Sequence, residues 1–140
     1  MNTKLLIATI VGAIASFLLG WLVYGTLLMD FWKTNTTIYE GLSVDPPRLW
    51  AIFLGGLCYC FLLAWIFDKW SNTRDFKGGF INGMIISLPI MLWTWLGYYA
   101  FLNLYTSTLM ITDIIVGTLF NGVVAGIIAA MLGRGKTAAA

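Results

Sequence analysis

The feature that most constrains this chain is a run of 25 mostly apolar residues, 108–132, that contains a single carboxylate, Asp113. As a helix, such a run is long enough to cross the roughly 30 Å hydrocarbon core of a bilayer. Asp113, Gly117, Asn121 and Ala125 recur at every fourth position and therefore share one helix face. Because lipid cannot solvate a carboxylate, this face is expected to contact protein. The run thus predicts that other helices of the chain pack around it.

Three further apolar runs supply these helices, over residues 5–29, 49–67 and 78–104. Only 10% of the 140 residues are charged and 60% are hydrophobic, whereas a soluble domain typically has about a quarter charged. The sequence therefore predicts an all-α fold, an integral membrane four-helix bundle with residues 1–140 forming one transmembrane domain. Residues 30–48 are expected to form a polar loop that rests partly at the headgroup level, and residues 68–77 a short charged turn.

The distribution of lysine and arginine predicts the orientation of the bundle. Two of these residues, Lys33 and Arg48, fall on one side of the predicted membrane. Six fall on the side that holds both termini: Lys4, Lys69, Arg74, Lys77, Arg134 and Lys136. The positive-inside rule then places both termini in the cytoplasm, and we expect a multi-pass protein of the bacterial inner (cytoplasmic) membrane.

Small residues recur at every fourth position in the predicted helices, which favours close helix packing. These packing positions are Gly12, Ser16, Gly20, Gly79, Gly83, Gly122 and Gly126. The last run has two such ridges, one through Gly117 and Ala125 and one through Gly122, Gly126 and Ala130. Either both ridges pack inside one protomer, or one of them packs against a second copy of the chain.

The depth of Asp113 in the membrane suggests which residues satisfy its carboxyl group. At about 1.5 Å of rise per residue, Tyr24 and either Tyr98 or Tyr99 reach a similar depth, and a tyrosine hydroxyl can donate a hydrogen bond to a carboxylate. Asp113 is then either a protonatable or ion-binding group on a transport path, or the acceptor of a structural hydrogen bond that pins the bundle.

Three other residues within the runs attract attention. Asn121 and Asn82 are expected to form hydrogen bonds between helices. Pro89, near the centre of the third run, removes a backbone hydrogen bond and is expected to kink its helix.

The residues that catalysis requires are scarce. The chain has no histidine, so neither a Ser–His or Cys–His nucleophile pair nor an imidazole metal site can form. A pair of facing carboxylates cannot form around Asp113, which has no acidic companion in the apolar runs. The net charge of +2 includes no basic cluster that would indicate a nucleic-acid partner. We therefore predict no enzymatic activity, no metal and no cofactor.

A family resemblance rests on Leu19–Leu27, which contains a Tyr24–Gly25 pair and is followed by Trp32, and on Ile111-Thr112-Asp113. In these segments the chain resembles the bacterial family of small four-span membrane proteins known as domain of unknown function 1761 (DUF1761). The family tends to place an aspartate at the start of the last helix. It often has a histidine shortly after that aspartate, which this chain lacks. The resemblance implies a fold and no function.

The leading functional interpretation is a non-enzymatic membrane protein that acts by helix–helix association in the lipid bilayer, as a homo-oligomer or as an accessory subunit of a membrane complex. The partner is then a second copy or another membrane protein. The alternative is a small-solute, ion or proton transporter or channel built from an oligomer, with Asp113 on the path.

Overall fold

The computed structural model describes residues 3–134 and shows four long helices. These are α1 (Thr3–Leu22), α3 (Leu49–Lys69), α4 (Phe76–Phe101) and α5 (Ser107–Gly133). All four are long and apolar enough to cross a membrane, which confirms the predicted all-α membrane bundle. They coincide with the four predicted runs to within three residues at every end, when the continuation of α1 through Leu27 is included. Lys136, which contributed to the predicted orientation, lies outside the described residues.

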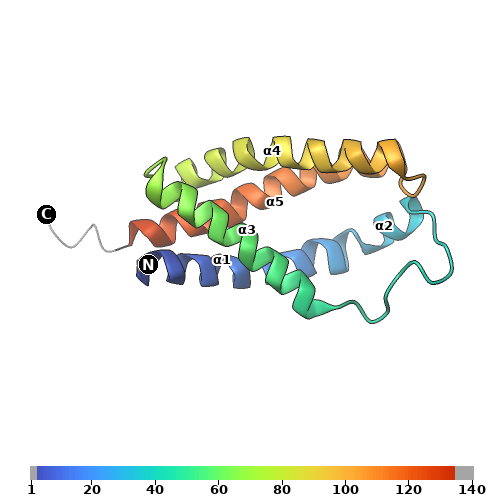
Figure 1. Cartoon of the computed structure of the whole chain (residues 1–140), viewed down its shortest axis with the longest axis horizontal. Helices are drawn as coiled ribbons and strands as arrows, with labels where there is room; N and C mark the ends of the chain where they lie inside the picture. Colours follow the sequence, from blue (N-terminus) through green and yellow to red (C-terminus); the bar gives the residue numbers. More distant parts are fainter. Residues whose placement is uncertain (1–2, 135–140) are drawn as a thin grey trace, which may run out of the picture.

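The helix ends gather in two groups (Figure 1). The start of α1, the loop between α3 and α4, and the end of α5 lie together, at what we call the terminal end. The short helix α2 (Met29–Asn35), the loop 36–48 and the turn between α4 and α5 lie at the opposite end, the α2 end. Every long helix runs between these two ends, as expected for membrane spans.

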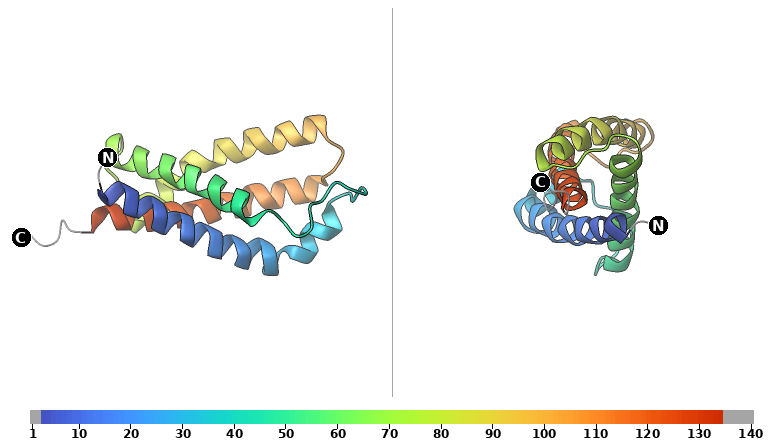
Figure 2. Two further views of the ribbon diagram at one scale, coloured as in Figure 1. Left: turned by 60° about the horizontal axis from the view of Figure 1, so that its bottom comes forward. Right: turned by 90° about the vertical axis from the view of Figure 1, so that its left-hand side faces the viewer.

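α5 is the central helix of the bundle. It packs against α1, α3 and α4, and Figure 2 shows it between α4 and α1. It has ten buried residues, twice as many as any other helix. Its buried positions include Asp113, Gly117 and Ala125 of the predicted stripe, while Asn121 is half-buried. The prediction that the other helices cover this run is therefore confirmed.

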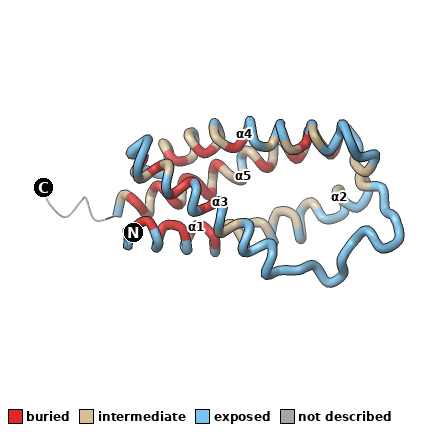
Figure 3. Tube along the Cα trace, viewed as in Figure 1, coloured by how far each residue is buried: buried red, intermediate tan, exposed pale blue. Residues whose placement is uncertain are grey.

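The hydrophobic core lies in the half of the bundle next to the terminal end (Figure 3). Leu63 and Phe67 of α3 and Ile128 of α5 are fully buried there, together with Leu5 of α1. The other half of α3 is different, because every residue from Leu49 to Gly55 is exposed. α3 is thus anchored at one end only.

The predicted polar loop 30–48 is in part helical, because α2 occupies Met29–Asn35. Its end is fastened to the α4–α5 turn by backbone hydrogen bonds from Thr37 to Leu104 (2.7 Å) and from Thr106 to Asn35 (3.1 Å). The Thr106 hydroxyl also donates to the side-chain oxygen of Asn35 (2.9 Å). These bonds link segments about 70 residues apart in the sequence, so local sequence patterns do not reveal them.

α1 ends in a π-helical segment, Val23–Leu27, that the apolar pattern does not reveal. The amide of Leu28 donates to the carbonyl of Val23 (2.8 Å), five residues earlier, which is the bond that defines a π turn. Such single π turns frequently occur at functional sites. This one contains Tyr24.

Candidate functional site around Asp113

Asp113 lies in the second turn of α5, and the start of that helix fixes its position. The hydroxyl of Thr106, the N-cap residue, accepts a hydrogen bond from the amide of Leu109 (3.1 Å). The turn that precedes Thr106 is short, so α5 returns directly along α4. Asp113 consequently faces α4, and only 7% of its surface is exposed.

Trp95 of α4 supplies the hydrogen bond to this carboxylate. Its indole Nε1 donates to Oδ2 of Asp113 over 2.8 Å, and both residues are buried. The prediction of a tyrosine donor at position 98 or 99 is therefore wrong. Tyr98 and Tyr99 are both exposed, and Tyr98 instead packs edge-on against the Trp95 ring.

The register of the α4–α5 hairpin explains why Trp95 is the donor. Trp95 and Asp113 lie equally far from Leu104 in the sequence, as do Met91 and Gly117. A Cβ atom added to Gly117 would overlap the methyl group of Met91. Two antiparallel helices joined by a tight turn pair residues at equal distances from that turn. The predicted runs, 78–104 and 108–132, centre this turn two residues later and pair Asp113 with Tyr99, so the observed end of α4 at Phe101 is what identifies Trp95.

Tyr24 approaches the same carboxyl group from the other side. Its hydroxyl lies 3.5 Å from where a Cβ atom of Gly117 would stand, so the glycine allows the tyrosine to come close to α5. The hydroxyl interacts with the Asp113 carboxyl group but does not complete a hydrogen bond of normal geometry. Among the described residues, the buried Oδ1 atom of Asp113 has no hydrogen-bond partner.

An aromatic cluster, Tyr24, Trp32, Trp95, Tyr98 and Tyr105, surrounds this site. The ring centres of Trp95 and Tyr105 are 5.2 Å apart, those of Trp32 and Trp95 5.9 Å, and those of Tyr24 and Trp32 6.2 Å. The rings come from the π-helical segment Val23–Leu27, α2, α4 and the α4–α5 turn. The cluster therefore ties the α2 end together around a single acidic group.

The two predicted interhelical asparagines behave differently from expectation. The amide of Asn82 donates to the hydroxyl of Thr73 in the α3–α4 loop (2.9 Å), so it bonds to a loop and not to a helix. Asn121 is half-buried on α5, and no side-chain hydrogen bond joins it to another described residue. Pro89 lies on an exposed face of α4, which continues as one helix through it.

Both small-residue ridges of α5 pack against α4. A Cβ atom on Gly83 would overlap Ala125 of the first ridge, and one on Gly79 would come within 2.7 Å of the Ala125 carbonyl oxygen. In the second ridge, a Cβ atom added to Gly122 would come within 2.7 Å of the Met84 side chain, and one added to Gly126 within 2.8 Å of the Phe76 ring. Of the two alternatives left open by the sequence, internal packing accounts for both ridges.

The small residues of α1 also have partners inside the protomer. A Cβ atom on Gly12 would come within 2.5 Å of Ile128 of α5. Gly20 faces Phe120 of α5, and the Ser16 hydroxyl lies beside Gly56 of α3. α1 therefore uses this face to contact the two helices on which it packs.

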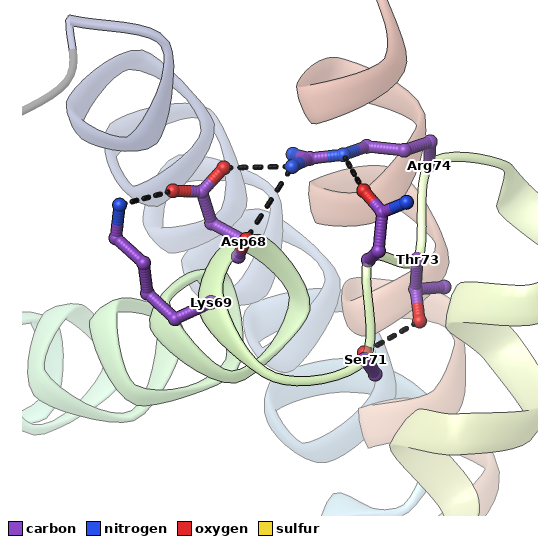
Figure 4. Close-up of polar contacts among 6 residues, drawn as sticks. Asp68, Lys69, Ser71, Thr73 and Arg74 are labelled. Carbon is purple, nitrogen blue, oxygen red and sulfur yellow. Dashed lines mark hydrogen bonds and ion pairs between the residues drawn. The ribbon is translucent and has the colours of Figure 1, made fainter.

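A second polar cluster, not predicted from the sequence, lies at the terminal end (Figure 4). The Arg74 guanidinium donates to Oδ1 of Asp68 (2.8 Å) and to the side-chain oxygen of Asn72 (3.1 Å). Lys69 pairs with the other carboxylate oxygen of Asp68 at 3.2 Å. The Asp68 side chain is 7% exposed, so this network neutralises a nearly buried charge and shapes the α3–α4 loop.

Neither polar cluster has the composition of a metal centre. Within residues 3–134, no three histidine, cysteine, aspartate or glutamate side chains come together in a group that could hold a metal ion. The site around Asp113 offers one carboxyl group, one indole, one phenol and a wall of aromatic rings. Such an arrangement can hold a proton or attract a cation, because a carboxylate is negatively charged and the faces of aromatic rings carry a negative electrostatic potential.

Comparisons of the chain with protein-family models, with curated proteins and with solved structures find no match. The resemblance to DUF1761 therefore stays a prediction.

Proposed function

We propose that this protein acts by association with another transmembrane helix, as a homo-oligomer or as an accessory subunit of a membrane complex, and that it is not an enzyme. The observation that carries the proposal is that two helical glycines, Gly55 and Gly97, have open space where a side chain would be. A Cβ atom added to Gly55 of α3 or to Gly97 of α4 would meet nothing within 4 Å, whereas every other described helical glycine has a neighbour within that distance.

Glycines that no other helix covers matter in a membrane, because the hydrophobic effect does not drive helices to associate in lipid. Close van der Waals packing at small residues takes its place. Gly55 belongs to the part of α3, Leu49–Gly55, that is exposed on every face. We infer that a partner helix packs against this half of α3, where its backbone can approach closely.

The test replaces Gly55 or Gly97 with leucine and measures the mass of the gently extracted protein. We expect the unmodified chain to form a complex, and each substitution to weaken it while the helical content stays unchanged, because both side chains enter open space. The matched control is Gly56→Leu, on a different face of α3. A monomeric unmodified chain, or leucine variants that assemble normally, would contradict the proposal. The mass itself distinguishes a homo-oligomer from a complex with other proteins.

Transport is the second candidate, and the unpartnered Oδ1 atom of Asp113 favours it. A buried ionisable group inside a membrane protein often belongs to an ion or proton pathway. The test is Asp113→Asn in reconstituted vesicles, with the exposed Asp30→Asn as control. Normal assembly with lost pH-dependent flux of protons or ions supports transport, whereas unchanged flux contradicts it.

We further propose that the protein resides in the bacterial inner membrane with both termini in the cytoplasm, and that it is a member of DUF1761. The excess of lysine and arginine at the terminal end supports this orientation.

A further inference from the structure

A groove of about 370 Å³ separates α1 from α3 in the half of the bundle next to the α2 end. Its walls include Gly20 and Tyr24 on one side and Ile52, Phe53 and Gly56 on the other. This volume falls in the range of small-molecule sites, about 300–1,000 Å³. The lining is almost entirely apolar, so the groove suits a hydrocarbon chain.

Two glycines create the space. A Cβ atom on Gly20 would stay 3.8 Å from Phe120, and one on Gly56 would stay 3.9 Å from the Ser16 hydroxyl. Both positions therefore have room for a Cβ atom, unlike the tightly packed glycines of α4 and α5. The absence of side chains here leaves a channel between α1 and α3 that their own packing does not fill.

The position of the groove determines what can reach it. It lies between two segments that can span a membrane, beside the exposed stretch Leu49–Gly55 of α3. Trp21, which lines the groove, and Trp50, which follows the lining residue Leu49, are 66% and 69% exposed, as is usual for tryptophans at the headgroup level. The molecules that meet such an opening are the lipids of the adjacent leaflet.

One cation, Arg48, adjoins the groove lining in the sequence. Pro47 and Leu49 both line the cavity, and Arg48 stands between them in the sequence, immediately before α3. Arg48 is exposed, and both ion pairs found among residues 3–134 involve Asp68 and not Arg48. A guanidinium group can form two parallel hydrogen bonds to a phosphate.

We propose that this groove is a binding site for an anionic phospholipid, with one acyl chain between α1 and α3 and the phosphate on Arg48. The site goes beyond the association surface, with which it shares Leu49, Ile52 and Phe53. The two can be tested apart, because Gly56 lines the groove and its neighbour Gly55 does not.

The test uses purified protein exposed to an equal mixture of phosphatidylglycerol and phosphatidylcholine, and counts the retained lipids by native mass spectrometry. We expect the unmodified chain to retain phosphatidylglycerol preferentially. Gly56→Leu fills the groove and should abolish retention, while Gly55→Leu should leave it unchanged. Arg48→Gln should weaken phosphatidylglycerol binding roughly tenfold, as expected for one lost charged hydrogen bond. Lys33→Gln, at the other cation of the α2 end, should have no effect.

The proposal is overturned if the unmodified chain retains both lipids equally, or if Gly56→Leu retains as much phosphatidylglycerol as Gly55→Leu. Ser16→Leu enlarges a groove-lining side chain of α1 beside Gly56 and provides the same test if Gly56→Leu does not fold. The variants Gly55→Leu and Gly56→Leu also distinguish failure of the lipid-site proposal from failure of the association proposal. Loss of assembly in Gly55→Leu concerns association, and loss of lipid in Gly56→Leu concerns the groove.

Discussion

Trp95 and Asp113 lie equally far from the turn between α4 and α5, and a 2.8 Å hydrogen bond joins the indole of one to the carboxylate of the other. The bond connects the two most extensively packed helices of the bundle at the α2 end. It gives the intramembrane carboxylate at least a structural role, whatever further role Asp113 has.

Replacing Trp95 with phenylalanine should destabilise the protein by about 1–3 kcal/mol, because it removes the donor to a buried acceptor. The free energy of unfolding can be measured by denaturant titration in detergent. Trp93→Phe is the control, since Trp93 is 80% exposed, and its effect should stay within about 0.5 kcal/mol. Asp113→Asn should remain close to the unmodified chain, because an amide oxygen also accepts from Trp95. Equal stability of the two tryptophan variants would refute the structural role of this bond.

Gly83→Leu should separate α4 from α5, because its side chain would run into Ala125 and the carbonyl oxygen of Asn121. Overpacking of this kind typically costs about 1–3 kcal/mol. The same titration measures the loss. Gly97→Leu introduces the same side chain into open space on the same helix and should leave the protomer's stability nearly unchanged. If Gly83→Leu is tolerated as well, the close approach of α4 to α5 is incorrect.

Arg74→Lys should destabilise the protein although it keeps the charge. Arg74 binds both Asp68 and Asn72, and a lysine cannot reproduce this forked geometry. Losing one charged hydrogen bond costs about 1.5–3 kcal/mol. Lys69→Gln is the control, because half of the Lys69 side chain is exposed and such pairs contribute little. An Arg74→Lys variant as stable as Lys69→Gln would show that the fork is unimportant.

The proposed orientation can be tested by cysteine labelling in intact cells. In a chain without Cys58 and Cys60, a cysteine at Ser43 should react with a membrane-impermeant reagent, and one at Ser71 should react only after the cells are broken. Both positions are exposed loop residues at opposite ends of the bundle. Labelling of Ser71→Cys alone in intact cells would mean that the bundle is inverted.

The spans and the central place of the last helix could be predicted from the sequence because both follow from solvation. Lipid demands long apolar helices, and it forces the face that carries Asp113 toward protein. α2 could not, because bonds to the distant α4–α5 turn hold its end. The π turn at Tyr24 and the Asp68–Arg74 network are local in sequence, but the apolar pattern carries no information about either. Trp95 was missed for another reason. The apolar pattern ends the third helix at Leu104, whereas α4 ends at Phe101, and this difference changes the hairpin register that decides which side chain meets Asp113.

The central position of α5 also has a consequence for biosynthesis. α5 leaves the ribosome after the other helices, yet α4 packs almost entirely on it. Until α5 enters the bilayer, α1 and α3 can pair, while Gly79 and Gly83 of α4 have only lipid to face. We therefore expect the nascent chain to pass through a stage in which α4 lacks the helix that buries its glycines.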